Sequence, residues 1–266
     1  MELQLSQQQI MLKSTIEKLC ADYCNLDKLR QIEDTKKGFS DDFWYQLVNL
    51  GLTGINIPTK FGGSEMGILD QVVVYEEFGR SLALSPHLTS SIICSYLINN
   101  LGSTSQKKEI LPSIASGELI ISLAWLEEGS SFFKNGINLT LNKKGKKHFI
   151  NGKKHMVPYA SEANKILVLC KDEDNIIAAI IDSENEDITQ KYQENHAKTS
   201  MYEVTFNNIE IEESNIIKNK NFWDVWQDIS YISQILISAE ASGGSERSLY
   251  IGRDYSLERK AFGQQI

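Results

Sequence analysis

The sequence predicts an α+β multidomain protein: an N-terminal all-α helical domain, a middle antiparallel β sandwich or barrel, and the start of a C-terminal helical bundle. Three observations support this fold class. Apolar residues recur at helical spacing before Gly117, continuous and alternating apolar runs replace them over residues 118–220, and helical spacing returns from Phe222. Helices and strands that are segregated along the chain are typical of the α+β class. We therefore expect domains at residues 1–117, 118–220 and 221–266.

Five helices are expected in the first domain. Apolar residues from Leu5 to Leu26 recur every three, four or seven positions, which predicts one long helix that ends before residues 35–38. A second helix begins after Ser40, a residue type that caps helix N-termini, and stops at Gly51. The remaining three are expected over residues 68–78, over residues 88–101, and from the capping box at 103–106 to a point before Pro112.

The middle domain is organised around Asn151-Gly152, a pair that suits a two-residue type I′ turn. We expect a hairpin with arms at 148–150 and 153–157, ended by Pro158 because proline has no N–H for the ladder. The polar stretch 182–200 is expected to be a surface loop. Further strands are predicted from apolar runs at residues 119–126, 137–141, 165–170, 176–181 and 202–206.

The last helical stretch, from Phe222 to about Lys260, carries small residues in its middle: Ala239, Ala241, Ser242, Gly243 and Gly244. Each glycine inside a helix costs about 1 kcal/mol relative to alanine. Close approach of a neighbouring backbone would offset that cost. We expect the neighbour to lie in helices that follow Ile266.

Composition excludes several classes of protein. A net charge of −8 without a basic stripe argues against nucleic acid and anionic membrane surfaces. The longest apolar runs fall short of the roughly 20 residues of a membrane span, and the start lacks the basic region of a signal peptide. One lysine cluster is predicted to be a solvated surface: Lys143, Lys144, Lys146, Lys147, Lys153 and Lys154.

Cysteines and histidines show no ligand spacing. The cysteines stand at 20, 24, 94 and 170 and the histidines at 87, 148, 155 and 196, so we expect no metal and no disulfide framework. Reduced thiols indicate a cytoplasmic location. The chain also lacks a GxGxxG, P-loop or GxSxG motif.

Five short segments stand in order from about residue 40 to the end. They are LGLTGINIP with FGG at 50–63, YEEFGR at 75–80, LP with SGE at 111–118, INGKK with AN at 150–164, and ERSL with RKAFG within 239–263. In this order and spacing they resemble the acyl-CoA dehydrogenase family of flavoproteins. The resemblance implies a divergent member that ends before the family's last helices.

The resemblance also implies a chemistry. Members bind FAD between the β domain and the C-terminal helices, and they remove the α and β hydrogens of an acyl-CoA, the first as a proton to a glutamate and the second as hydride to flavin. An acyl-CoA substrate, an electron-transfer partner and a homo- or hetero-oligomer are therefore expected.

The resemblance places the two flavin loops at Trp125-Leu126 and at Met156-Val157-Pro158. Arg259 and Phe262 match residues of the family segment whose arginine reaches the FAD diphosphate of a neighbouring subunit, and guanidinium suits phosphate. Helix-end solvation and core packing are the alternative roles for these last two residues.

Three departures from the family pattern are visible. Leu126 stands where a flavin-binding threonine is common, and Met156 with Pro158 stand where an aromatic and a hydroxyl residue are common. The catalytic glutamate of most members lies beyond Ile266, and the position that other members use is Ser233, which is no general base. We therefore assign no catalytic residue. Neither Glu76 with Glu77 nor Glu127 with Glu128 is expected to form an acid–base pair.

Three functions follow from these expectations. The first is FAD-dependent α,β-dehydrogenation of an acyl-CoA thioester. The second is a non-catalytic partner subunit that lends Arg259 to the flavin of an active homologue. The third is another flavin redox activity, an oxidase or monooxygenase, on the same fold.

Overall fold

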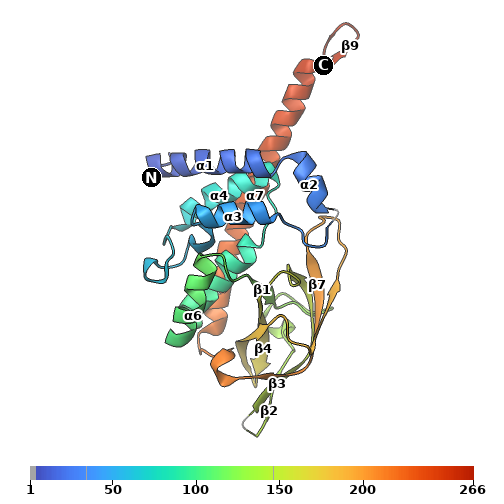
Figure 1. Ribbon diagram of the computed structural model, residues 1–266. Helices are drawn as coiled ribbons and strands as arrows, with labels where there is room; N and C mark the ends of the chain where they lie inside the picture. The colour runs from blue at the N-terminus through green and yellow to red at the C-terminus, as the bar shows by residue number, and fades with distance from the viewer. Residues whose placement is uncertain (1–3, 34, 146) are drawn as a thin grey trace. The chain divides into compact units, whose positions relative to one another are not determined.

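The computed structural model describes residues 4–33, 35–145 and 147–266. These residues divide into two compact units (Figure 1). The helical unit comprises Met1–Leu29, Gly67–Leu84 and Ile232–Ile266, and the β-containing unit comprises Arg30–Met66 and Ser85–Tyr231. The predicted order of N-terminal helices, middle strands and a long C-terminal helix is confirmed. The boundaries at residues 117 and 220 stay predictions.

The helical unit is built on α1 (Gln7–Tyr23), α4 (Ile68–Ser81) and the greater part of α7 (Phe222–Glu258). Ser6 opens α1 with a capping box, and Cys24 ends it. The single helix expected up to Leu26 is therefore wrong, because a second helix, α2 (Leu26–Glu33), begins there. The expected stop of α4 at Gly79 is also wrong: Leu82 ends the helix in the left-handed conformation, at φ 53°.

Glycines place α4 and α7 in backbone contact. A Cβ built on Gly79 would lie 1.7 Å from the carbonyl oxygen of Glu240, and one built on Gly243 would lie 1.8 Å from that of Glu76. Both distances are far below any real contact, so only glycine fits at either position. The predicted close backbone approach is confirmed. The expected location of its partner is wrong, since α4 precedes α7 in the sequence.

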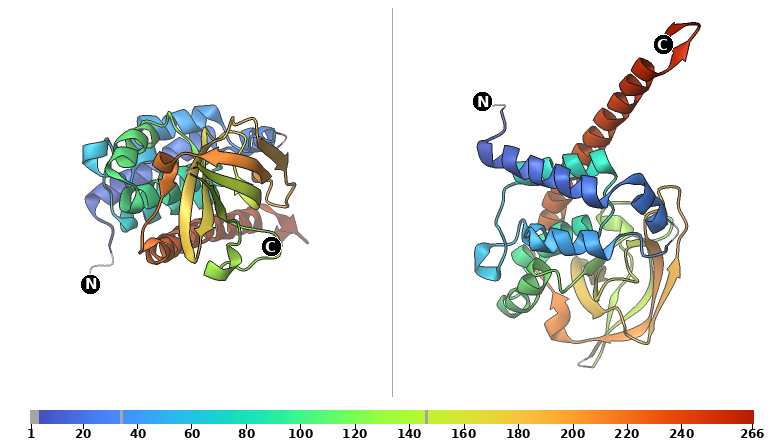
Figure 2. Two further views of the ribbon diagram at one scale, coloured as in Figure 1. Left: turned by 90° about the horizontal axis from the view of Figure 1, so that it is seen from below. Right: turned by 45° about the horizontal axis from the view of Figure 1, so that its top comes forward.

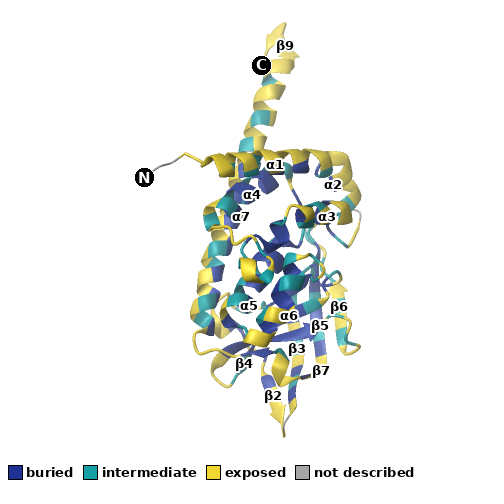
Figure 3. Ribbon diagram, turned by 60° about the vertical axis from the view of Figure 1, so that its left-hand side comes forward, coloured by how far each residue is buried: buried dark blue, intermediate teal, exposed yellow. Residues whose placement is uncertain are grey.

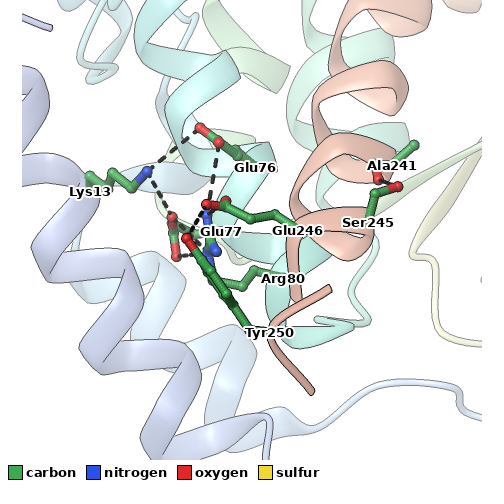
Figure 4. Close-up of polar contacts among 8 residues, drawn as sticks. All are labelled: Lys13, Glu76, Glu77, Arg80, Ala241, Ser245, Glu246 and Tyr250. Carbon is green, nitrogen blue, oxygen red and sulfur yellow. Dashed lines mark hydrogen bonds and ion pairs between the residues drawn. The ribbon is translucent and has the colours of Figure 1, made fainter. Parts of the chain in front are cut away.

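Acidic and basic side chains from all three helices form an ion-pair network, which Figure 4 shows. Glu77 is 1% exposed, and its carboxylate accepts from Nε of Arg80 at 3.1 and 3.3 Å. Arg80 also pairs with Glu246 of α7, and Lys13 of α1 lies 3.4 Å from Glu77. These contacts make Glu77 an ion-paired helix residue.

The helical part of the β-containing unit is made of short segments: α3 (Asp41–Asn49), η1 (Leu52–Gly54), η2 (Thr59–Phe61), η3 (Leu88–Cys94), α5 (Ser95–Leu101) and α6 (Thr104–Ala115). Ser40 and Ser103 cap α3 and α6 as predicted. The regular helix expected over 88–101 is wrong in its first half, where η3 is a π-helix. The expected end before Pro112 is also wrong, since α6 continues through it.

Two four-stranded sheets complete this unit, in the orders β1-β4-β5-β8 and β2-β3-β7-β6. Their strands are β1 (Ile121–Ala124), β2 (Leu141–Lys144), β3 (Lys147–Pro158), β4 (Lys165–Asp172), β5 (Asn175–Asp182), β6 (Ile188–Tyr192), β7 (Met201–Ile211) and β8 (Ile216–Ile217). Both sheets contribute to one apolar core, and Figure 2 shows them facing each other. In Figure 3 their core-lining strands are largely dark blue. The sandwich is antiparallel as predicted except for the parallel pair β1–β4.

The hairpin expected at Asn151-Gly152 is wrong. Both residues lie inside the continuous strand β3, and the register with β7 shifts between Ile150 and Gly152. Gly152 has φ 150°, so this glycine serves a β-bulge and no turn. The hairpin lies earlier in the chain, between β2 and β3. Lys144 pairs with Lys147 at its closed end, and Gly145 lies in its turn. Lys146, a member of the predicted lysine surface, lies outside the described residues.

Two further expectations concern the loop at residues 182–200 and membrane spans. The expected loop at 182–200 contains β6, which extends the second sheet. Within the described residues, no helix is long and apolar enough to cross a membrane.

His87 makes the stability of this unit depend on pH. The ring is buried, its Nε2–H donates to the carbonyl oxygen of Leu52 at 2.9 Å, and burial lowers the pKa to about 4 from 6.5. Between these pKa values the unfolded chain binds a proton at His87 that the folded chain does not bind. The free energy of unfolding is therefore highest above pH 6.5 and decreases as the pH falls towards 4. We expect a loss of about 3 kcal/mol across this window.

Urea unfolding of the wild type and of His87→Gln, measured at both ends of the window, checks this expectation. The glutamine amide can still donate to Leu52 but does not titrate. The variant should therefore lose less stability than the wild type. Equal losses in the two proteins would show that other groups cause the acid sensitivity.

Candidate functional site

Two segments of the β-containing unit meet where the flavin loops are expected. Trp125 and Leu126 follow the end of β1, and residues 156–158 form the end of β3. An isolated antiparallel bridge joins Leu126 to His155, whose N–H donates to the Leu126 carbonyl oxygen at 2.9 Å. The structure therefore brings together two segments that lie 30 residues apart in the sequence.

The end of β3 is shaped by a second bulge. The register with β7 shifts between Lys154 and Val157, and Met156 takes the left-handed conformation at φ 52°. Such a conformation in a non-glycine residue stores strain and is often found at functional sites. The Met156 side chain is 44% exposed, while Val157 is fully buried in the core. The bulge thus presents Met156 at the surface beside the bridge.

Aromatic side chains surround the other segment. The Trp125 ring lies 5.1 Å from that of Trp226 at the start of α7 and 5.9 Å from that of Phe132. Trp226 is buried and Phe132 is exposed, so Trp125 connects the interior to an apolar surface. Trp226 cannot be identified from the sequence, because its helical spacing gives no sign of the strand end that it contacts.

A partly buried ion pair holds the same segment. Lys154 is fully buried, and its Nζ lies 2.8 Å from Oε1 of Glu127. The prediction of a solvated lysine cluster is therefore wrong for Lys154, since alternation along β3 turns its side chain inward while Lys153 remains exposed. Glu128 is exposed, so the two adjacent glutamates point to different environments.

Arg259 and Phe262 lie in the helical unit. Both are exposed: Arg259 lies between the end of α7 and the two-stranded hairpin of β9 (Lys260–Ala261) and β10 (Gln264–Gln265), and Phe262 lies in that hairpin. Phe262 and Gly263 form its turn at φ 53° and 85°. Core packing of Phe262, one alternative from the sequence, is wrong in this chain. The role of both residues toward FAD stays a prediction.

No catalytic or metal group emerges from the described residues. They hold no group of three or more histidine, cysteine or acidic side chains placed to bind a metal ion. Ser233, the position at which the resemblance implies a glutamate in other proteins, is buried in α7. The four cysteines are free and buried.

The sequence pattern described as "Acyl-CoA dehydrogenase, N-terminal domain" matches residues 6–118. Among curated proteins, the mitochondrial isovaleryl-CoA dehydrogenase of Pongo abelii is 33% identical over 172 residues, which cover 63% of this chain and 40% of that protein. The chain thus spans about two-fifths of the length of this relative.

Solved structures share the fold over the whole chain. A glutaryl-CoA dehydrogenase in complex with glutaryl-CoA superposes with a TM-score of 0.90 at 21% identity, covering 100% of this chain and 70% of that one. A chain of the ChsE4-ChsE5 complex from Mycobacterium tuberculosis superposes with a TM-score of 0.88 at 19% identity, with coverages of 100% and 71%. The solved structures show the shared fold, and the matches in sequence identify the family: the chain belongs to the acyl-CoA dehydrogenase family.

Proposed function

We propose that this chain forms the flavin-binding part of an FAD-dependent acyl-CoA dehydrogenase that desaturates an acyl-CoA thioester between its α and β carbons. The observation that supports this proposal is the bridge between Leu126 and His155, which joins the two expected flavin loops. An acyl-CoA substrate, an electron-transfer partner, assembly into an oligomer and a cytoplasmic location belong to the same proposal.

The residues at the bridge fit a flavin through apolar contacts and main-chain groups. Met156 is exposed at a bulge, and a thioether packs well on an aromatic ring. Trp125 and Leu126 add further apolar surface, while Leu126 and Pro158 offer no hydroxyl. Hydrogen bonds to the ring would therefore come from main-chain N–H groups. When bound, FAD supplies the acceptor for the hydride of the substrate.

The chain's own residues would bind, orient and shield. Trp125, Leu126 and Met156 would hold the ring system and exclude water, and buried Val157 would fix the bulge that presents Met156. Arg259 and Phe262 would serve the FAD of a neighbouring subunit, where the guanidinium suits a diphosphate. We assign no general base among the described residues.

A non-catalytic partner subunit is the second candidate function. The missing hydroxyls at Leu126 and Pro158 and the serine at position 233 favour it. The ChsE4-ChsE5 complex, one chain of which shares this fold, supplies a precedent for assembly of such a chain with a second one. Another flavin redox activity, as an oxidase or monooxygenase, is the third candidate, and nothing in the geometry favours it over the first.

Titration with FAD tests the first function. The wild-type chain should acquire a visible flavin spectrum and quench flavin fluorescence, and Met156→Glu should weaken binding by more than about tenfold, or roughly 1.4 kcal/mol, because it places a charge against an apolar ring. Met66→Glu, at another exposed methionine of the same unit, should bind like the wild type.

Two other outcomes decide against this assignment. Binding that is indifferent to Met156→Glu would place the flavin elsewhere. A wild-type chain that takes up FAD only when mixed with a homologous acyl-CoA dehydrogenase would support the partner subunit.

A further inference from the structure

Lys154 is a fully buried cation in the middle of the β-containing unit. Its ammonium donates to Oε1 of Glu127 at 2.8 Å and to the main-chain carbonyl oxygen of Trp125 at 3.1 Å. Removing the ammonium from water costs several kcal/mol, while the Glu127 carboxylate that pairs with it keeps 14% of its side chain exposed, and an apolar side chain of equal volume is often as stable at such a position. The fold alone therefore gives no reason for a lysine at this position.

Glu127 is itself fixed by main-chain groups. Its Oε1 and Oε2 accept from the N–H of Asn138 at 2.9 and 3.1 Å, and its Oε1 accepts from the N–H of Leu139 at 2.9 Å. Burial by itself would raise the pKa of this carboxyl, but the bonds from Lys154 and from both N–H groups hold the pKa below its usual value. The carboxylate thus gives Lys154 a rigid anchor.

The contacts of Lys154 continue those of the bridge. Its side chain holds the carbonyl oxygen of Trp125, and the N–H of the next residue, His155, holds the carbonyl oxygen of Leu126. The two carbonyl oxygens of the Trp125-Leu126 segment are therefore each held by a hydrogen bond from one of two successive residues of β3. Immediately afterwards, the bulge turns Met156 to the surface.

We propose that Lys154 is a positioning residue, which, on the function proposed above, locks the Trp125-Leu126 segment to the Met156 bulge so that both meet the flavin in a fixed relation. It acts through the main chain and does not touch the cofactor. An apolar residue at 154 could fill the same volume but could not hold the Trp125 carbonyl.

The double variant K154M/E127Q separates this role from folding. It keeps both volumes and removes both charges, and the glutamine oxygen can still accept from Asn138 and Leu139. We expect its thermal unfolding to stay within a few degrees of the wild type. Amide exchange at His155, followed by mass spectrometry, should accelerate by more than about tenfold because the bridge to Leu126 loosens, and FAD affinity should fall by a similar factor.

An exposed ion pair on the same strand provides the control. Lys147 lies 2.7 Å from Glu210 across β3 and β7, with side chains 62% and 47% exposed. The variant K147M/E210Q should leave both the exchange at His155 and the FAD affinity unchanged. If K154M/E127Q does not fold, E127Q alone, which weakens the anchor and keeps the lysine, should accelerate exchange at least about threefold.

Amide exchange tests the positioning role of Lys154, and FAD affinity tests its link to the cofactor. Unchanged exchange at His155 in a folded K154M/E127Q would overturn the positioning role, whatever FAD does. Faster exchange with unchanged FAD affinity would overturn the link between the segment and the cofactor. If no FAD binds to the wild type, the proposed function falls, and the exchange experiment still decides whether Lys154 holds the segment.

Discussion

Gly79→Ala is expected to lower the free energy of unfolding of the helical unit by more than about 3 kcal/mol. Alanine is the better helix former by about 1 kcal/mol, so propensity alone predicts the opposite sign. The new Cβ, however, would lie 1.7 Å from the Glu240 carbonyl oxygen, which is backbone and cannot rotate away. The two helices would have to separate, and the buried contacts between them would be lost.

Alanine substitutions at three glycines of α7 show how the cost depends on the space around the added Cβ. Gly243→Ala meets the Glu76 carbonyl at 1.8 Å and should cost as much as Gly79→Ala. Gly244 has its nearest contact at 3.4 Å, so alanine there should be nearly neutral. Gly252 has no atom within 4 Å of the added Cβ, and alanine there should stabilise by about 0.5–1 kcal/mol through propensity alone.

Urea unfolding followed by circular dichroism measures all four variants. The expected order of stability is Gly252→Ala, wild type, Gly244→Ala, and then the other two. If Gly79→Ala and Gly243→Ala were as stable as Gly252→Ala, α4 and α7 would not be in backbone contact, and the glycines would need another explanation.

The sequence predicts that α7 makes a close backbone contact, but it does not identify the helix on the other side. Interior glycines in α7 predicted that some backbone approaches, because their propensity cost needs an offset. The partner could not be named, since Gly79 reads as a helix stop when only local signals are used. Its real role depends on Glu240, more than 150 residues away. Local rules therefore gave the wrong meaning to Gly79 and the right meaning to Gly243.

The strand signals show the same limit. Apolar runs correctly located β4 and β5, because a strand buried on both faces needs no partner to be recognised. Asn151-Gly152 was misread because the pair suits a turn and a bulge equally well, and the pairing with β7 decides between them. The true hairpin has Gly145 in its turn, without a preceding asparagine or aspartate.

At the candidate site, the sequence located segments and missed what supports them. The resemblance predicts Trp125, Leu126 and Met156 as flavin contacts, and the bridge at His155 joins the two segments that carry them. Lys154 was missed because it stands among lysines that are solvated, and only the alternation of β3 distinguishes it. Trp226 was missed because a contact between a helix start and a strand end has no periodic signal in the sequence.

Arg80→Met is expected to cost the helical unit about 3 kcal/mol, because it removes the main counter-ion of a buried carboxylate. Arg80 serves three glutamates: Nε donates to Glu77, while Nη2 pairs with Glu246 and lies 3.8 Å from Glu76. The hydrogen bond from Arg80 also holds the pKa of Glu246 below its usual value. After the change, Lys13 alone would face three negative charges.

The cost should come from Glu77, which is buried, and much less from the other two carboxylates, which water reaches. Adding Glu77→Gln to Arg80→Met should therefore recover most of the lost stability, since the buried charge is then gone. Arg253→Met is the matched control: its pair with Asp254 is exposed, with side chains 58% and 52% accessible, and its loss should stay within about 0.5 kcal/mol. A double variant no more stable than Arg80→Met would mean that the guanidinium acts by joining α4 to α7 through Glu246, and that Glu77 is sufficiently neutralised by Lys13.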